Sequence, residues 1–480
     1  MSRALGLSRP TAIRHCLQAP GSPKLPEGRI KALASFSSRP SPRAQSFPVA
    51  GRPSPPPSSP TAGPREQRDM EERYRTSRLP PGLLILGASG GVAQALLQLL
   101  PEYRHEFGEL VLMDGRRGVT DSPFLDHRAL RYTFIEHHLD IRRADAELAP
   151  ICTRHAIGIV LDLTDARSLP ILKATHRAGA SYINTMLNDE RFTVPEQHAQ
   201  ILSCRAEFAN RPHLLCTGMN PGIVNHWVSQ AIVRHGRPHE IAFFEFDSSA
   251  PADMPPHECA PFITWSRKEF LHEIAEEPGG RLSDGGEIEW LRPNALSHPV
   301  DMRPHLAPIV ARSSYPRGML LLHEEVVTLG RRFNLPASFT YGIHPASLAA
   351  LRSSWLSNDR LTVADLLLAD NVTVPLAGSD LVGVWLKYDD RDVRIFNVMH
   401  NRDLRGTNDT YRQVAVGVLA GIRAMAHGQI PCGVHFVEDL DSPVFAETVR
   451  THMVVQEHIV WKPQPEVQPV RRDVPLARRT

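Results

Sequence analysis

Short apolar runs alternate with amphipathic stretches from Leu79 onward. Residues 83–100 have the pattern of an apolar strand, a Gly/Ser turn and a helix whose apolar positions recur at helical spacing. The same pattern predicts further short buried strands, with helices such as 169–179 between them. These strands are predicted at 109–117, 158–165, 180–186 and 213–222. Because strands that alternate with helices form parallel, doubly wound sheets, we predict an α/β fold.

The pattern changes after Gly222. Residues 239–265 and 308–345 carry apolar and aromatic strand-like runs with less regular helix between them, which predicts a mixed sheet. Residues 410–428 form an amphipathic helix that we expect to return to the first sheet. The predicted organisation is a leader at 1–78, a first domain at 79–222 with a returning segment at 408–455, an inserted α+β domain for substrate binding and dimerisation at 223–407, and a tail at 456–480.

The leader differs in composition from the rest of the chain. It is rich in Pro, Ser and Arg, contains Glu27 as the one acidic residue before Glu66, and shows no hydrophobic periodicity. Such a segment cannot bury enough apolar area to offset its chain entropy, so we expect disorder. Two alternatives stay open: an organelle transit peptide, which the many prolines disfavour, and a true start at Met70.

Charge and composition exclude several classes of protein. The 480 residues contain 54 Lys and Arg against 52 Asp and Glu, a balance unlike that of a phosphate-neutralising nucleic-acid binder. No apolar run approaches the roughly 18 residues of a membrane span. The six cysteines show no CxxC spacing, so we predict neither disulfides nor a zinc site, and we expect a cytoplasmic protein that binds no metal.

A glycine-rich turn follows the first predicted strand. Gly87, Gly90 and Gly91 lie where backbone N–H groups at a helix start can approach a pyrophosphate, although Ser89 and Val92 occupy the second and third glycine positions of GxGxxG. Asp114 ends the next strand, where a carboxylate accepts hydrogen bonds from ribose hydroxyls. These features predict a Rossmann-type domain that binds NAD. Arg116 and Arg117 keep NADP open as an alternative.

Five motifs carry a resemblance to a known family. They are GMNPG (218–222), FFEFD (243–247), FITWSRKEFLHE (262–273), LLHEE (321–325) and NDTYRQVAVGVLAGI (408–422). In order and spacing they resemble the bacterial homospermidine synthases, which are Rossmann proteins of the saccharopine dehydrogenase-like group. The resemblance implies an NAD-dependent oxidation of putrescine to an imine, transfer of the aminobutyl group to a second diamine, and reduction by the same NADH. Spermidine is a further candidate substrate, and the resemblance also implies a homodimer.

The resemblance also implies the site residues. The catalytic residues would be Trp265, Asn220 and His323, with the Trp265 ring face stabilising cationic intermediates. The amine-binding residues would be Asp165, Glu245, Glu273, Glu325 and Asn188. The NAD-binding residues would be Gly87, Ser89, Gly90, Gly91, Val92, Asp114, Thr164, Asp165, Asn220 and Pro221. Asn188 departs from the family, which has a glutamate there, although Asp189 and Glu190 follow directly.

Taken singly, each of these residues also fits an ordinary structural role. A carboxylate at a strand end often caps a helix, and a tryptophan in an apolar stretch is often a core residue. Two other functions therefore remain as alternatives. The first is a saccharopine or carboxynorspermidine dehydrogenase-like enzyme with net hydride transfer, whose carboxylate substrate would require arginine in the pocket. The second is a Rossmann protein that senses NAD(H) without turnover.

Overall fold

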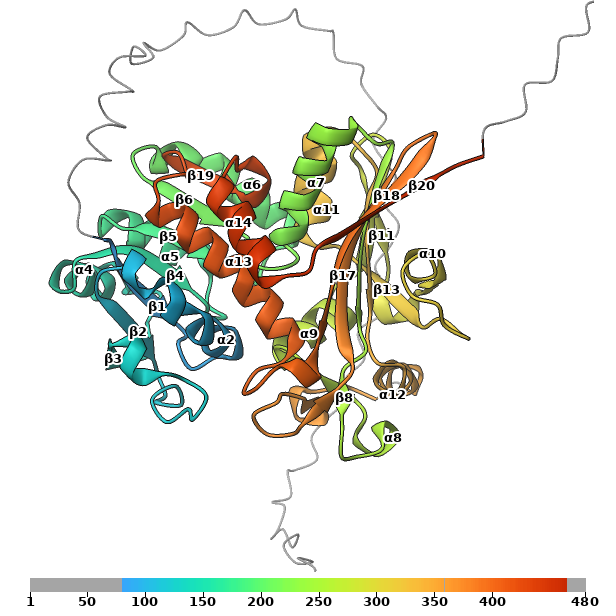
Figure 1. Ribbon diagram of the computed structural model, residues 1–480, viewed down its shortest axis with the longest axis horizontal. Helices are drawn as coiled ribbons and strands as arrows, with labels where there is room; N and C mark the ends of the chain where they lie inside the picture. Colours follow the sequence, from blue (N-terminus) through green and yellow to red (C-terminus); the bar gives the residue numbers. More distant parts are fainter. Residues whose placement is uncertain (1–79, 358, 464–480) are drawn as a thin grey trace, which may run out of the picture. The chain divides into compact units, whose positions relative to one another are not determined.

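A parallel sheet of seven strands forms one half of the fold (Figure 1). In spatial order its strands are β19 (Gly433–Phe436), β6 (Pro212–Leu215), β5 (Ser181–Asn184), β4 (Ile157–Asp162), β1 (Gly82–Leu86), β2 (Leu110–Asp114) and β3 (Tyr132–Glu136). The computed structural model describes residues 80–357 and 359–463, so the predicted leader lies outside the described residues. The order changes direction between β1 and β4, which places their carboxyl ends beside a crevice where such sheets bind ligands.

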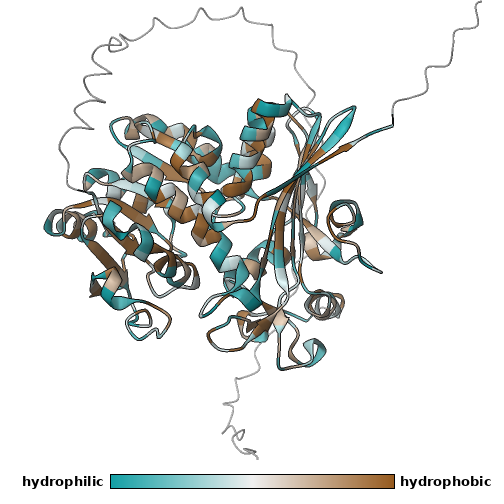
Figure 2. Ribbon diagram, viewed as in Figure 1, coloured by the Kyte–Doolittle hydropathy of each residue, from teal (hydrophilic) through white to brown (hydrophobic). Residues whose placement is uncertain are grey.

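Helices cover both faces of this sheet because its strands are apolar on both sides. Successive side chains of a strand point to opposite faces, and every residue of β1 is buried. Leu84 and Leu86 join one core with α4 (Ala144–Arg154), α5 (Ser168–Arg177) and α6 (Val194–Cys204). Leu83 and Ile85 join another with α2 (Gly91–Leu99) and α13 (Asp409–Ala426). The brown colour of β1, β2 and β4 in Figure 2 follows from these apolar runs.

A second, mixed sheet of nine strands follows the helix α7 (Ile223–His235). Its strands are β7 (Glu240–Asp247), β10 (Gly279–Leu282), β11 (Ile288–Leu291), β12 (Pro299–Asp301), β13 (Arg317–Leu321), β14 (Ala337–Gly342), β17 (Ser379–Lys387), β18 (Arg391–His400) and β20 (Gln456–Trp461). Strands β7 and β14 pair in parallel, and the other pairs are antiparallel. The predicted Rossmann-type sheet and mixed second sheet are therefore confirmed.

Shorter elements connect and cover the two sheets. The helices are α3 (His127–Leu130), α8 (Pro256–Cys259), α9 (Arg267–Leu271), α10 (Arg303–Leu306), α11 (Glu324–Phe333), α12 (Pro345–Leu356) and α14 (Pro443–His452). Two small ladders pair β8 (Ala250–Pro251) with β16 (Leu376–Ala377), and β9 (Phe262–Ile263) with β15 (Leu367–Leu368). Within the described ranges, the chain has no helix that is both long and apolar enough to cross a bilayer.

The structure corrects the prediction in two places. Residues 456–461, predicted as part of a tail, form β20 and pair with β18. Most side chains of β20 are exposed, so the strand has no apolar face that a sequence pattern could reveal. The long antiparallel pair β17 and β18 was not singled out either, although it joins β7 to the edge strand β20 in the second sheet.

Candidate functional site

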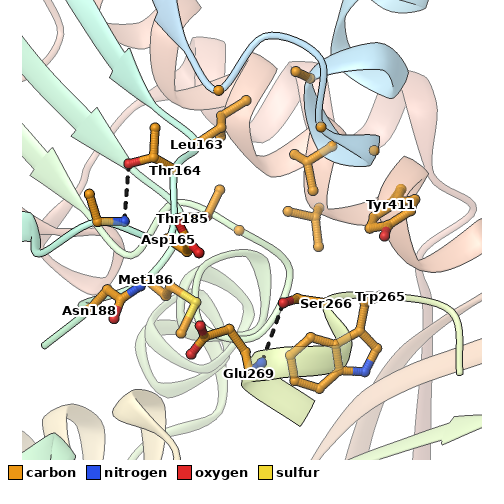
Figure 3. Close-up of a pocket in the computed structure, with 18 of the residues that line it drawn as sticks. Leu163, Thr164, Asp165, Thr185, Met186, Asn188, Trp265, Ser266, Glu269 and Tyr411 are labelled. Carbon is orange, nitrogen blue, oxygen red and sulfur yellow. Dashed lines mark hydrogen bonds between the residues drawn. The ribbon is translucent and has the colours of Figure 1, made fainter. Parts of the chain in front are cut away.

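A cavity of about 1130 Å³ lies between the carboxyl ends of β1, β4 and β5 and the second sheet. Its wall combines the glycine turn and the strand ends of the first sheet with α9, β7 and β14 of the second. Figure 3 shows part of this wall, with Asp165 and Asn188 on one side and Trp265 and Tyr411 on the other. The volume exceeds that of most single small-molecule pockets, so it can hold a dinucleotide with a second small ligand.

The glycine turn forms one end of the cavity. Gly87 has φ +73°, and a Cβ there would lie 2.6 Å from the Leu163 carbonyl oxygen, so the turn requires glycine. The turn closes with the Gly90 N–H donating to the Gly87 carbonyl at 3.0 Å. Helix α2 then begins at Gly91 without a side-chain cap, which leaves its first N–H groups available to an anion. The ring of Tyr411 lies against Gly91, where a Cβ would clash with it.

Asp114 lies beside this turn at the end of β2. Its Oδ2 accepts from the Ser89 N–H at 2.9 Å, and its Oδ1 accepts from the Arg116 N–H at 3.0 Å. Each carboxylate oxygen has a second lone pair for a ribose hydroxyl. Arg117 forms an ion pair with Glu136, in which Nε of Arg117 is 2.5 Å from Oε2 of Glu136. The Ser89 hydroxyl donates to the Arg116 carbonyl at 2.7 Å, so Ser89 supports this loop and does not line the cavity.

The ends of β4 and β5 supply the next part of the wall. Thr164 donates from its hydroxyl to Asp162 at 2.7 Å, which shapes the turn after β4 and presents Asp165 to the cavity. Asn188 is fixed through its backbone: its N–H donates to the Ser168 hydroxyl, and its carbonyl accepts from the Ser168 N–H, both at 2.9 Å. Asn188 lines the cavity (Figure 3), and its contact with an amine stays a prediction.

Glu245 on β7 meets Asn220 across the junction of the two sheets. The Asn220 amide donates from Nδ2 to Glu245 Oε2 at 2.5 Å. Burial raises the pKa of Glu245 to about 8, although the Asn220 hydrogen bond acts in the opposite direction. The nearby Asp247 carboxylate raises it further. Glu245 is therefore largely protonated at neutral pH and can exchange a proton with a bound amine.

Three further buried carboxylates lie behind Glu245, and the sequence did not single them out. They are Asp247 on β7, Asp380 on β17 and Asp409 at the start of α13. Burial raises the pKa of each, that of Asp409 to about 8. Hydroxyl and amide groups satisfy most of their oxygens: Thr264 donates to Asp247, Ser249 to Asp409 and Gln413 to Asp380.

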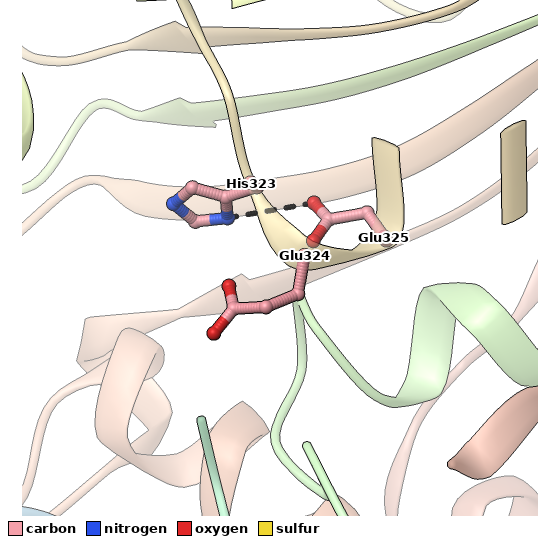
Figure 4. Close-up of side chains that lie close together, drawn as sticks. All are labelled: His323, Glu324 and Glu325. Atoms are coloured by element: carbon pink, nitrogen blue, oxygen red, sulfur yellow. Dashed lines mark ion pairs between the residues drawn. The ribbon is translucent and has the colours of Figure 1, made fainter. Parts of the chain in front are cut away.

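His323 lies between two glutamates. Its Nε2 is 3.2 Å from Glu273 Oε2. Its Nδ1 is 3.5 Å from Glu325 Oε1, the ion pair drawn in Figure 4. Burial alone would lower the pKa of His323, but these two carboxylates outweigh burial and raise it well above the usual value. His323 and Glu273 line the cavity, whereas Glu325 is fully buried behind the imidazole. Glu325, predicted as a direct amine contact, does not line the cavity, and the start of α11 directs Glu324 there instead.

Glu324 links the two sheets at this point. It accepts a hydrogen bond from the Leu187 N–H at 3.0 Å, and burial raises its pKa to about 7. The ligand atoms of His323, Glu324 and Glu325 lie within 4.8 Å of one another, a spacing that a cation could bridge. A metal ion bound there would have to displace the proton that Glu273 and Glu325 favour on His323.

Trp265 lines the middle of the cavity, directly before α9. Its indole N–H donates to the Tyr341 hydroxyl at 2.9 Å, and its ring meets Phe270 edge to face at a centroid distance of 5.9 Å. Tyr341 lies opposite Glu245 in the pairing of β14 with β7, so both side chains are on the sheet face that turns toward the cavity. These contacts hold the indole plane in one orientation.

The structure thus brings together most of the predicted site. Of the predicted residues, only Ser89 and Glu325 do not line the cavity. Sequence reasoning missed many of the lining residues, among them Glu269, Glu324, Tyr341 and Tyr411. Two of these were next to predicted positions, since Glu324 adjoins His323 and Glu269 lies within the FITWSRKEFLHE motif.

Comparison with known proteins supports the same assignment of the first sheet. Residues 83–212 match the saccharopine dehydrogenase NADP binding domain. This part of the chain is saccharopine dehydrogenase-like. It contains the glycine turn, Asp114 and strands β1 to β5, so the prediction of a nicotinamide dinucleotide cofactor is confirmed at the level of the domain. No curated protein sequence matches the chain.

Solved structures extend the likeness to the second sheet. Homospermidine synthase from Legionella pneumophila, in complex with NAD, is similar with a TM-score of 0.63 and 17% identity, over 84% of this chain and 97% of that chain. Amine dehydrogenase from Mycobacterium smegmatis is more distant, with a TM-score of 0.37 and 10% identity over 76% of this chain and 96% of that chain. The chain therefore has an NAD(P)-binding oxidoreductase fold that is structurally similar to homospermidine synthase.

Proposed function

We propose that the protein is a homospermidine synthase-type enzyme that uses NAD. In this reaction a primary amine of putrescine is oxidised to an imine. A second diamine attacks the imine carbon, ammonia leaves, and the new imine is reduced to a secondary amine. The hydride that leaves in the first step returns in the last, so the reaction has no net change of redox state. The fold and the charge of the cavity support this proposal.

The observation that carries the proposal is the acidity of the cavity wall away from the glycine turn. The wall there includes the acids Asp165, Glu269 and Glu273, together with Glu245, which is largely protonated at neutral pH. Among the described residues that line the cavity, Arg116 is the only lysine or arginine, and it follows Asp114 at the dinucleotide end. A substrate with carboxylates, as in saccharopine-type chemistry, would meet repulsion here, whereas a diamine would find counter-charges.

The chain's residues fit a dinucleotide, and they favour NAD over NADP. The uncapped start of α2 suits a pyrophosphate, and Asp114 suits the two hydroxyls of the adenosine ribose. A 2′-phosphate would meet the Asp114 carboxylate, and Arg117 is held by Glu136. When bound, the nicotinamide would accept a hydride from the carbon next to the amine and return it later.

Glu245 would exchange a proton with the amine, and Asn220 would orient Glu245 for this exchange. An alkylammonium group must lose a proton before its carbon can release hydride, and the nitrogen lone pair is also needed for attack on the imine. Glu245 has a pKa of about 8, close to working pH, which is the range where a carboxylate exchanges protons effectively in both directions. Asn220 fixes the orientation of the carboxylate through its hydrogen bond.

Trp265 and Glu273 would bind the cationic intermediate. The indole face attracts a cation, and the hydrogen bond to Tyr341 keeps that face in place. Glu273 supplies a negative charge, and its contact with His323 fixes its position. The indole face and the carboxylate would therefore stabilise positive charge, and His323 would act only by positioning Glu273.

Purified protein with putrescine and a catalytic amount of NAD tests the proposal. We expect mass analysis to detect homospermidine and ammonia in amounts that greatly exceed the NAD supplied, with no net accumulation of NADH. A product that accumulates in step with NADH would instead support a net amine dehydrogenase. No product and no NADH, from protein that binds NAD, would favour the sensor alternative.

A further inference from the structure

One carboxylate oxygen of Glu269, on α9, receives no hydrogen bond from the described residues. The residue is 9% exposed, and its Oε1 atom is buried without a hydrogen-bond partner among the described residues. Figure 3 shows its side chain directed into the cavity, between Trp265 and the segment from Met186 to Asn188. Because a buried carboxylate oxygen is costly without a partner, this atom indicates a ligand that donates a hydrogen bond.

The surroundings of Glu269 specify the charge of that ligand. Burial raises the pKa of Glu269, and the nearby carboxylates of Glu273 and Asp165 raise it further. The nearest cation is Lys268, whose Nζ is 3.6 Å from Glu269 Oε1 and also 3.6 Å from Glu190 Oε2. The Lys268 side chain is 52% exposed, so it can move aside into solvent. An ammonium ion with several N–H donors would match this wall better than a neutral ligand.

The two acids that follow Asn188 in the chain, Asp189 and Glu190, are engaged elsewhere, and Glu324 already accepts a hydrogen bond from the Leu187 N–H. Asp189 makes a two-pronged contact with Arg191, at 2.8 and 2.6 Å, and is thereby neutralised. Glu190 is 69% exposed and reaches Lys268 from outside the cavity. The side chain of Asn188 is a neutral amide on a fixed backbone. At this part of the wall the buried negative charge therefore comes from α9 and not from the loop after β5.

We propose that Glu269 is the specificity-determining carboxylate of the cavity, which binds the second ammonium group of a diamine, the one remote from the reacting carbon. Lys268 takes the place of that ammonium group when no ligand is bound. This inference rests on the proposed function for the identity of the substrate, but binding tests it independently of turnover. Glu269 would distinguish diamines from monoamines of the same length, because only a diamine has a second ammonium group.

Calorimetry on the full chain with NAD present provides the test. Putrescine and 1-aminobutane are titrated into wild type, Glu269→Gln and the control Glu276→Gln. Glu276 lies on the adjoining helical turn with a side chain that is 67% exposed, and it does not line the cavity. For Glu269→Gln we expect putrescine binding to weaken roughly 10- to 100-fold, and 1-aminobutane binding to change little. The control should match wild type for both amines.

A second variant should change putrescine binding in the opposite direction. Lys268→Met removes the competing ammonium group, so putrescine should bind a few-fold more tightly, a gain that a damaged fold cannot produce. Unchanged putrescine binding in Glu269→Gln, an equal loss for both amines, or weaker binding in Lys268→Met would overturn the inference. If wild type binds putrescine through Glu269 but forms no homospermidine, the inference stands and the proposed function fails. If homospermidine forms and Glu269→Gln binds putrescine normally, the reverse holds.

Discussion

The side-chain amide of Asn220 and the carboxylate of Glu245 join the two sheets by a hydrogen bond of 2.5 Å. Asn220 follows β6 of the first sheet, and Glu245 lies in β7 of the second. Because the bond crosses the cavity wall, the ionisation of Glu245 is coupled to the relative position of the two sheets. Burial raises the pKa of Glu245 to about 8. Within the physiological pH range, the acceptor of this hydrogen bond therefore changes from a protonated carboxyl group to a carboxylate.

We expect Glu245 to make the protein less stable as pH rises from about 4.5 to about 8. In this window Glu245 is protonated in the folded state and ionised in the unfolded chain, because its pKa rises from 4.5 to about 8 on folding. The unfolded state then binds fewer protons than the folded state, so the free energy of unfolding decreases with pH. Each unit of pKa difference corresponds to about 1.4 kcal/mol.

Glu245→Gln should therefore show a shallower pH dependence than wild type, since its neutral amide does not titrate. Urea unfolding at several pH values across the window measures the slope for each protein. Asp409, whose pKa is also about 8, should preserve part of the slope in the variant. Glu258→Gln, at an exposed site, is the control. Identical slopes for wild type and Glu245→Gln would show that Glu245 ionises normally in the folded state.

Asp114→Asn should weaken NAD binding roughly 10- to 100-fold, because the ribose hydroxyls lose a charged acceptor. The asparagine keeps the side-chain shape and can still accept from one of the two backbone N–H groups that now contact Asp114. Affinity for NADP should fall less, because the repulsion of a 2′-phosphate also disappears. Calorimetry with both dinucleotides measures the ratio, with Asp121→Asn as the control. A parallel loss for both dinucleotides would count against the ribose contact.

The sequence was sufficient to predict the parts of the site whose residues are close together in the chain. The turn from Gly87 to Gly91 and the end of β2 at Asp114 follow from short patterns in which strand, turn and helix are adjacent. The acids behind Glu245 follow no such pattern. Asp380 lies opposite Asp247 only because β17 pairs with β7 in one particular register, and these strands are more than a hundred residues apart in the chain.

Neighbouring residues at a helix start were a second source of error. Glu324 and Glu325 begin α11, and successive residues of a helix point about 100° apart. A single sequence does not reveal the rotation of that helix about its axis, which is set by its contacts with the first sheet. The Leu187 N–H fixes Glu324 at the cavity, and Glu325 is directed behind His323. The resemblance identified the cluster but not the direction of each side chain.

Gly91→Ala should destabilise the protein and impair NAD binding together. A Cβ at this position would clash with the ring of Tyr411, so either the ring or the start of α2 must move. Overpacking of this kind costs about 1 to 3 kcal/mol. Tyr411→Ala should therefore cost less stability in the Gly91→Ala background than in wild type, because it also removes the clash, whereas Tyr411→Phe should cost the same in both backgrounds. An equal cost of Tyr411→Ala in both backgrounds would show that the ring is not the obstacle.

Trp265 offers the sharpest separation of a catalytic role from a structural one. If its indole face stabilises a cationic intermediate, Trp265→Phe should retain most of the turnover, because a weaker aromatic face remains. Trp265→Leu should lose a stabilisation of about 1 to 2 kcal/mol, equivalent to roughly a five- to thirty-fold loss in rate. Both variants also lose the hydrogen bond to the Tyr341 hydroxyl, so that loss cancels in their comparison.

The melting temperatures of Trp265→Phe and Trp265→Leu show how much the tryptophan contributes to stability. Trp265 is partly buried against the core, so both replacements should lower the melting temperature, and a purely structural tryptophan would show only this effect. Tyr341→Phe removes the hydrogen bond while it keeps the indole, so it should lose less turnover than Trp265→Leu if the ring face is what matters. Folded Trp265→Leu protein that binds NAD and turns over putrescine at the wild-type rate would contradict the cation-stabilising role. In that case the acids of the wall, and not the indole, would account for the affinity of the cavity for cations.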